Sequence, residues 1–440
     1  MATNAKAQST PRRLHGAAGA PHKGVDDATP GAVAAERLGL HVRRLCSLDE
    51  VGAADWDACF PEGDPFAHHA FLAALERHGC ASPRTGWTPA HVVVEDASGR
   101  LVAAAPAWFK THSWGEFVFD FSWAQAAERA GIRYYPKLVC AIPFTPVTGP
   151  RLGVRAGTPA AEARRALVNG LREAAQAEGV SSLHALFLRP AERDVFLTAG
   201  CEERRDIQFH WYNESYRNFT DFLAVLRHDR RKKILRERRR ISDAGLTLRW
   251  DHGSALSDDD WRSVYELYAH TYLERGEYPY LSFEFFLDYA RQPADALRIV
   301  SVHDGTRRVA AAIFLEGGDT LYGRHWGAAA YYDSLHFETC YYQGIEYCIT
   351  HGLQHFDAGA QGAHKLVRGF VPRETLSVHW LANPRLAAAV ARSLDAERPM
   401  VDARREALDR YLPYRETVER KGTTRAPAQN AGATQRRRHG

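Results

Sequence analysis

The second half of this chain repeats an order of features that its first half already contains, and this duplication constrains the fold most. In each half an aromatic helix follows a proline, a β-hairpin follows that helix, and a later helix ends at a glycine just before a strand. The hairpins are expected around Gly99 and Gly305, and the helix-ending glycines are Gly179 and Gly352. Three features in the same order favour duplication over a chance likeness of alanine-rich hairpins. The sequence therefore predicts an α+β module that is used twice.

The expected boundaries follow from composition and from the spacing of these features. We expect a first module over residues 37–208 and a second over residues 209–415. The terminal segments 1–36 and 421–440 contain few periodic apolar residues, so they are expected to be disordered tails. The first module carries an aromatic insertion at about residues 110–150. The second begins with a basic helix, expected over residues 221–242.

Composition and missing signatures exclude several classes of protein. The longest apolar run, Leu101–Phe109, is too short to cross a bilayer, so no integral membrane segment is expected. The N-terminus lacks the apolar core of a signal peptide, and the seven cysteines form no CxxC pair. These features favour a reducing cytoplasm and suggest neither a disulfide framework nor a metal site. No P-loop, GxSxG, HExxH or GxGxxG signature is present, so the corresponding enzyme classes are unsupported.

The second module contains a candidate donor-binding segment. A strand is expected over Thr320–Gly327, and residues 324–329 match the pattern R-x-x-G-x-A. A small-residue turn between a strand and a helix presents backbone N–H groups that can bind pyrophosphate or another anion. The alternative is a strand that ends in an ordinary small-residue turn. The candidate donor-binding residues are Arg324, Trp326, Gly327, Ala328 and Ala329.

The helix that follows contains a candidate general base. It is expected from about Ser334 to His351, and Glu338 lies on its apolar stripe. Burial raises the pKa of a carboxyl group, which makes Glu338 a plausible base. The alternative is a structural ion pair with Arg324 or Arg368.

Two further features favour the second module as the catalytic one. The corresponding helix of the first module, residues 160–178, carries no acid on its inward stripe. His336 and His325 lie near Glu338 but rank after it, because a lone histidine is more often structural. Downstream, a glycine-rich loop bears His364, Lys365 and Arg368, and its cations suit phosphate or carboxylate. A solvated basic loop is the alternative.

A block of basic residues, Arg227–Arg240, is the most charged segment of the chain. A rough apolar stripe predicts an amphipathic helix with a basic outer face. This face could contact tRNA phosphates, an anionic lipid-linked precursor or a membrane surface, or could simply be a charged connector between modules. The candidate polyanion-binding residues are Arg230, Arg231, Lys232, Lys233 and Arg236.

The insertion of the first module interleaves aromatic and charged residues. This composition suits a surface that binds a sugar, peptide or nucleotide, and would equally suit an interface between the modules. The candidate substrate-binding residues are His112, Glu116, Asp120, Tyr135 and Lys137.

Several segments together resemble a known family. They are HSWGEFVFDFSWA, YYPKL, PFTPVTGPRL, SSLHALFL, QFHWYN, RKKILRERR, TLYGRHWG, LHFETCYYQ and GAQGAHKLVRGF, spread over about residues 42–415. They are similar to FemAB-like peptidoglycan biosynthesis/recognition proteins of the GNAT acyltransferase superfamily. The resemblance implies two GNAT-like modules, each a mixed, mostly antiparallel sheet flanked by helices. It also implies acyl-CoA or, as in Fem ligases, aminoacyl-tRNA as co-substrate, with no tightly bound cofactor.

Two departures from the family pattern stand out. Ala329 lies five residues before Ser334, whereas GNAT enzymes place this loop directly at the helix N-terminus. Fem-type proteins often have a Phe-Lys pair where this chain has His364 and Lys365.

We therefore expect an N-acyltransferase that moves an acyl or aminoacyl group to an amine, such as that of a peptidoglycan precursor. Glu338, with His336 after it, is the expected base or relay, and Lys365 and Arg368 are the expected anion contacts. The rival hypothesis is an inactive double module that recognises peptidoglycan or lipid-linked precursors.

Overall fold

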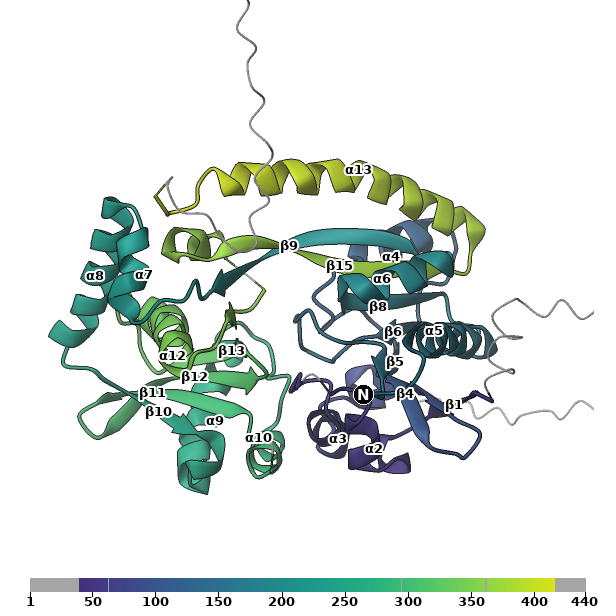
Figure 1. Ribbon diagram of the computed structural model, residues 1–440, viewed down its shortest axis with the longest axis horizontal. Coiled ribbons are helices and arrows are strands. Elements are labelled where there is room, and N and C mark those ends of the chain that lie inside the picture. The colour runs from purple at the N-terminus through teal and green to yellow at the C-terminus, as the bar shows by residue number, and fades with distance from the viewer. Residues whose placement is uncertain (1–38, 62, 294, 361, 416–440) are drawn as a thin grey trace, which may run out of the picture.

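The computed structural model describes residues 39–415 except 62, 294 and 361 (Figure 1). The tails expected at residues 1–36 and 421–440 lie outside the described residues. Two α/β halves lie side by side, and the strands β9 and β15 and the helix α13 extend across both (Figure 1). None of the helices in the described part of the chain combines the length and hydropathy needed to cross a membrane.

The first half builds a sheet in which two strands bend. β2 continues into β3 past Ala90, and β4 continues into β5 past Pro106. Because β2 pairs with β5 and β3 with β4, the four form one bent antiparallel pair. The strands are β1 (His41–Leu45), β2 (Trp87–Pro89), β3 (His91–Glu95), β4 (Leu101–Ala105), β5 (Ala107–Lys110), β6 (Lys137–Cys140), β7 (Gly153–Val154), β8 (Ser182–Leu188) and β9 (Glu202–Tyr212). The helices are α2 (Ala53–Asp57), α3 (His69–Arg77), α4 (Phe121–Arg129), α5 (Ala160–Ala177) and α6 (Pro190–Thr198).

The second half supplies six strands and, at its end, the longest helix among the described residues. Its strands are β10 (Thr247–His252), β11 (Leu297–Asp304), β12 (Arg307–Gly317), β13 (Thr320–Ala328), β14 (His355–Asp357) and β15 (Val371–Leu381). Its helices are α7 (Phe219–Val225), α8 (His228–Asp243), α9 (Asp258–Leu273), α10 (Phe283–Ala290), α11 (Leu335–Phe337), α12 (Gln343–His351) and α13 (Pro384–Asp409).

The strand order confirms the duplication. In the first half one sheet has the order β1, β3, β4 and β7, and the larger sheet has β2, β5, β6 and β8 in succession. Joined through the bent strands, the order is β1, β3/β2, β4/β5, β6 and β8, and in the second half it is β10, β11, β12, β13 and β14. In both halves every pairing is antiparallel except the last, β6 with β8 and β13 with β14, which is parallel. The expected hairpins are β3–β4 and β11–β12, and Gly179 and Gly352 end α5 and α12 with positive φ.

The two halves exchange their last strands. β9 follows β8 along the chain but pairs with β14, and β15 follows β14 but pairs with β8. β9 and β15 also pair with each other in antiparallel register from Val371–His210 to His379–Glu202. The expected division between residues 208 and 209 therefore falls inside β9. One sheet of eleven strands runs through both modules.

The repeated aromatic helices pack against each other. The Phe71 ring of α3 lies edge-on to Phe285 and Tyr289 of α10, with ring centroids 5.4 and 5.3 Å apart. Aromatic pairs in this geometry add to the stabilisation from burying apolar area. Both helices belong to one apolar core that reaches across the two modules.

The expected basic helix over residues 221–242 is wrong as a single element, because it is two helices, α7 and α8. Leu226 is extended between them and forms a β-bridge with Tyr414. The Arg227 N–H donates to Pro413 O at 2.8 Å, and the Arg415 N–H donates to Val225 O at 3.0 Å. The C-terminal segment therefore pairs with the backbone groups at the break.

The helix expected from Ser334 to His351 is also interrupted. A π-helical turn over Glu338–Tyr342 separates α11 from α12. π-helical turns are rare in proteins, and those that occur often lie at functional sites.

Candidate functional site between the modules

A cavity of about 590 Å³ opens where β13 and β14 separate. These parallel strands pair only from Thr320–His355 to Tyr322–Asp357. Beyond that point the cavity is lined by residues 323–326 of β13 on one side and residues 358–360 on the other. Backbone polar groups on facing edges of separated strands are free to bind a ligand.

The wall from the second module carries a cluster of titratable side chains: His336, Tyr341, His364 and Lys365. The Tyr341 hydroxyl and His364 Nε2 are hydrogen-bonded at 2.8 Å. Burial, together with Arg368 and Lys365, lowers the pKa of His364. Burial, with His364 and Arg368 nearby, also lowers the pKa of His336 to about 4. Both imidazoles are therefore neutral at pH 7.

Lys365 brings a cation to the same wall. Its side chain is buried, and its ammonium group donates to Gly359 O. Burial lowers the pKa of Lys365 to about 8, although the Asp357 carboxylate opposes this shift. Lys365 therefore remains mostly charged at neutral pH while lying in a poorly solvated place.

The residues of the R-x-x-G-x-A pattern form a strand and not the expected turn. Arg324 lies at a bulge between β12 and β13, and its guanidinium donates to Phe144 O of the other module at 2.8 Å. Arg324 and Trp326 line the cavity. Gly327 faces α9, where an added Cβ would lie 1.8 Å from Leu267 O. Ala328 pairs with Ala310, and the Ala329 N–H donates to Val309 O.

Glu338 lies behind the cavity wall and does not line it. Its Oε1 is 3.2 Å from an Arg238 nitrogen and accepts a hydrogen bond from Gln343 Nε2 at 2.8 Å. Burial raises the pKa of Glu338, and Arg238 opposes the shift. Its Oε2 is buried without a hydrogen-bond partner. The ion pair considered from sequence is present, but its partner is Arg238 and not Arg324 or Arg368.

Arg368 also lies outside the cavity. Its guanidinium is 2.9 Å from Glu237 Oε1 of α8 and donates to the Tyr342 hydroxyl at 2.9 Å. A further bond to His364 O fixes the turn that carries Lys365. Arg368 thus joins α8, the π-helical turn and the Lys365 turn.

The basic helix α8 packs through Ile234, Glu237 and Ile241, which are buried. Lys232 and Arg236 are exposed on it, whereas Arg230, Arg231 and Lys233 are partly buried. The Arg231 guanidinium is hydrogen-bonded to His228, and Lys233 lies 3.8 Å from Glu237.

The first module supplies the opposite wall through the loop between β5 and α4. Trp114, Gly115, Phe117 and Phe119 line the large cavity, together with Phe144 and Pro146. Phe117 and Phe119 also line a second cavity of about 340 Å³ beside β9, β15 and α13. The loop is therefore a partition between two cavities.

The five expected substrate-binding residues lie in or beside that loop, but none of them lines either cavity. Glu116, Asp120 and Lys137 form a buried charged cluster with Ser113, and the Tyr135 hydroxyl is hydrogen-bonded to Ser113 Oγ. The His112 ring covers Gly86 and accepts the Trp114 N–H.

In the first module, Arg151 occupies the place where β6 and β8 separate. β6 and β8 pair only from Leu138–Leu183 to Cys140–Ala185. Arg151 is buried just beyond and donates to Leu186 O at 3.0 Å and to Val147 O at 2.7 Å. This difference favours the second module as the site of chemistry.

Three tyrosines that line the cavity were missed from sequence: Tyr268, Tyr272 and Tyr280. Tyr268 and Tyr272 lie four residues apart on α9, a spacing that is also typical of an ordinary core stripe. Tyr341 was seen only as part of such a stripe.

Comparison with known proteins gives the family and the fold. No curated protein matches the chain. The chain resembles the crystal structure of FemX, with 13% identity, a TM-score of 0.51, and coverage of 78% of this chain and 98% of FemX. It is also similar to L-PGS from Bacillus licheniformis, with 10% identity, a TM-score of 0.48, and coverage of 78% and 97%. A tandem GNAT protein from the clavulanic acid pathway gives 14% identity, a TM-score of 0.41, and coverage of 78% and 99%.

The FemX likeness supports the expected fold class of two GNAT-like modules, which the repeated strand order shows directly. The profile of the FemAB-like family, described as peptidoglycan biosynthesis/recognition, matches residues 47–416. The resemblance read from the sequence is confirmed, and the chain belongs to the FemAB-like peptidoglycan biosynthesis/recognition family.

Proposed function

We propose that this protein is an N-acyltransferase that joins an acyl or aminoacyl group to an amine in the cavity between its modules. The observation that carries the proposal is the 590 Å³ cavity at the separation of β13 and β14, with cations and neutral histidines on its wall. Membership of the FemAB-like family and the likeness to FemX support the same class of reaction.

The chemistry needs a group that accepts a proton and groups that stabilise an oxyanion. An alkyl amine has a pKa near 10, so it must lose a proton to attack the donor carbonyl. His364, hydrogen-bonded to Tyr341, faces the cavity and is neutral, so we assign this role to it. His336 lies beside it on the same wall, but its pKa of about 4 makes it the weaker base. The Lys365 ammonium would stabilise the developing negative charge.

Substitution of Lys365 tests this assignment. Lys365→Met should lower kcat by about 10²- to 10³-fold, since one oxyanion donor is removed. His364→Gln should lower kcat by about 10²-fold, as expected for loss of a general base. The matched control is His41→Gln, at an exposed position on β1.

The assay follows thiol release from acyl-CoA donors and product mass with amine acceptors, including peptidoglycan stem peptides. Unchanged turnover in both variants would contradict the assignment. Binding of acceptors by the wild type with no turnover of any donor would favour the recognition module.

The donor class is a separate question, for which α8 is informative. If aminoacyl-tRNA is the donor, the exposed cations of α8 hold its phosphates. Lys232→Glu/Arg236→Glu should then weaken tRNA binding and reduce the slope of log K against log salt by about 2. If acyl-CoA is the donor, the same double variant leaves turnover unchanged. Both binding and turnover are measured on the full chain.

A further inference from the structure

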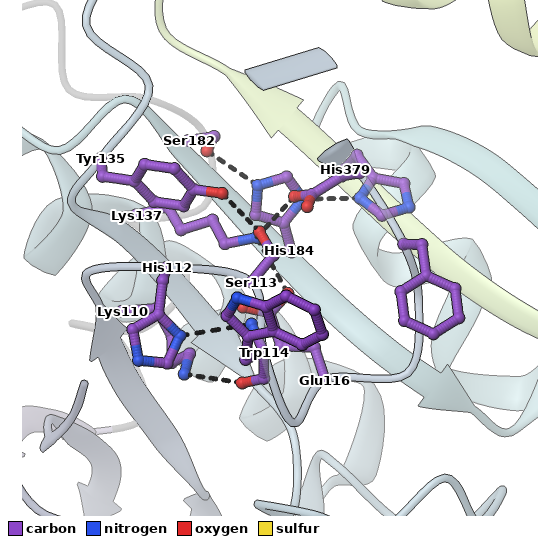
Figure 2. Close-up of polar contacts among 12 residues, drawn as sticks. Lys110, His112, Ser113, Trp114, Glu116, Tyr135, Lys137, Ser182, His184 and His379 are labelled. Atoms are coloured by element: carbon purple, nitrogen blue, oxygen red, sulfur yellow. Dashed lines mark hydrogen bonds and ion pairs between the residues drawn. The ribbon is translucent and has the colours of Figure 1, made fainter. Parts of the chain in front are cut away.

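The loop between β5 and α4 presents two different faces. Its aromatic residues face the two cavities, whereas Ser113, Glu116 and Asp120 are turned inward and are at most 4% exposed. Figure 2 shows Ser113, Glu116 and Tyr135 gathered around Lys137. Because inward and outward residues alternate along one loop, contacts that fix the inward side chains also fix the position of the aromatic side chains.

Lys137 holds the inner face at three points. Its ammonium donates to Ser113 Oγ at 2.8 Å, to Glu116 Oε2 at 2.8 Å and to Asp120 Oδ2 at 2.5 Å. A lysine ammonium has three hydrogens, so all its donors are used on residues of this one loop. Lys137 itself is fully buried on β6, in the sheet of the first module. The loop is thereby fixed to a strand of the first module's sheet.

The loop backbone is strained beside the residues that Lys137 binds. Phe117 has a φ of 62°, a left-handed conformation that bulky residues rarely adopt. Gly115 has a φ of 84°, and an added Cβ there would lie 2.8 Å from the Phe144 ring. Such conformations persist only when the surroundings over-determine them, and they cluster at ligand sites.

Further hydrogen bonds support the contacts between Lys137 and the loop. The Tyr134 hydroxyl donates to Asp120 Oδ2 at 2.6 Å, and Lys110 donates to Trp114 O at 3.1 Å. Two carboxylates face one ammonium, and Glu116 Oε1 and Asp120 Oδ1 are buried without partners. A single carboxylate, or apolar side chains of similar volume, would make a buried cluster at this place more stable.

We propose that Lys137 is a positioning residue, which clamps the loop 113–120 so that Phe117 and Phe119 form the partition between the two cavities. This inference rests on the proposed function only in taking the larger cavity as the reaction site. The residues Ser113, Glu116 and Asp120 act through Lys137 and do not touch substrate.

Amide hydrogen exchange of the full chain, read by mass spectrometry, tests the clamp without any substrate. In Lys137→Met the amides of residues 113–120 should lose at least about tenfold of their protection, while those of β8, β9 and β15 keep theirs. Lys365→Met is the matched control, because it removes an equally buried lysine from the opposite wall. It should leave the exchange of residues 113–120 unchanged.

A double variant separates positioning from stability. Lys137→Met alone removes the cation that is hydrogen-bonded to two buried carboxyl groups, so it is expected to be less stable. Lys137→Met/Asp120→Asn removes one of these carboxyl groups and should recover much of the thermal stability. The loop should nevertheless remain unprotected, because its anchor is still missing.

Wild-type protection of the loop in a folded Lys137 variant would overturn the proposal. Recovery of loop protection in the double variant would also overturn it, since charge balance alone would then be sufficient. In the acyl-transfer assay, the double variant should raise KM for the acceptor at least about tenfold with a smaller change in kcat. If the wild type shows no turnover, the proposed function fails, but the exchange result still decides the clamp.

Discussion

Three buried carboxyl groups in this chain differ in acidity according to the cations around them. Burial alone would raise the pKa of Asp120, but Lys137 and His184 hold it well below its usual range. Burial raises the pKa of Glu116 to about 7, and the neighbouring Asp120 charge adds to the shift, although Lys137 opposes it. Glu338 is shifted in the same direction as Glu116, with Arg238 opposing. A buried carboxyl group therefore serves as a fixed anion at Asp120 and as a titrating group at Glu116.

The Glu116 shift predicts a pH dependence of stability. Its folded pKa is raised from 4.5 to about 7, so the native state holds a proton that the unfolded state has lost in this interval. The contribution of Glu116 to the free energy of unfolding therefore falls as the pH rises from about 4.5 to 7. Glu116→Gln removes this term, so the variant should gain about 1 to 3 kcal/mol relative to the wild type between pH 5 and pH 8. Thermal or urea unfolding at a series of pH values measures the difference, and a flat difference would contradict it.

Glu338→Gln should affect stability more than catalysis. The substitution removes a charge partner of Arg238, which retains Glu346 at 2.6 Å. We expect a loss of about 1 to 2 kcal/mol in the free energy of unfolding and less than about a tenfold change in kcat. Urea denaturation and the acyl-transfer assay measure the two quantities. A loss of about 10³-fold in kcat with the fold retained would instead restore Glu338 as base or relay.

At the scale of elements, the contact between β13 and α9 determines one wall of the cavity. Gly327 of β13 allows the α9 backbone to approach, and Thr271 of α9 donates to Trp326 O at 2.8 Å. Tyr268, Thr271 and Tyr272 of α9 line the cavity as a result.

Gly327→Ala should therefore displace α9. An added Cβ would lie 1.8 Å from Leu267 O, a backbone atom that cannot rotate away. We expect a loss of about 2 to 4 kcal/mol in stability, comparable to severe overpacking. Gly52→Ala is the matched control, because its nearest contact would be Asp55 Oδ2 at an ordinary 3.5 Å. Equal melting temperatures for the two variants would contradict this account.

Much of this element structure could be predicted from sequence, because hairpins and glycine-ended helices are set by local patterns. The break at Leu226 could not, since it depends on backbone pairing with Tyr414, far along the chain. The role of Glu338 was left open for the same reason, because its partner Arg238 lies on a helix that no local pattern connects to it. Lys365, Arg324 and Trp326, which the sequence predicts as donor contacts, line the cavity. Glu116, Asp120 and Lys137, which it predicts as substrate contacts, lie together in a buried cluster that lines neither cavity.

At the scale of the molecule, the exchange of β9 and β15 makes the modules depend on each other. β8 has β15 as its partner, and β14 has β9. Sequence patterns give no register between strands so far apart, so the exchange could not be predicted.

This dependence predicts one cooperative unfolding transition for the full chain. Calorimetry should give a van't Hoff enthalpy close to the calorimetric enthalpy. Fragments 39–213 and 214–415 should fail to fold separately and should associate when they are expressed together. Two separate transitions, or a folded first fragment, would contradict the prediction.

The exchange also has a consequence for synthesis on the ribosome. When the first half emerges, β8 can pair with β6 but not yet with β15, because β15 begins only at Val371. Until then the unpaired edge of β8 offers hydrogen-bond donors and acceptors to any other nascent chain. A chaperone that shields this edge until the last strand leaves the exit tunnel should therefore raise the yield of folded protein.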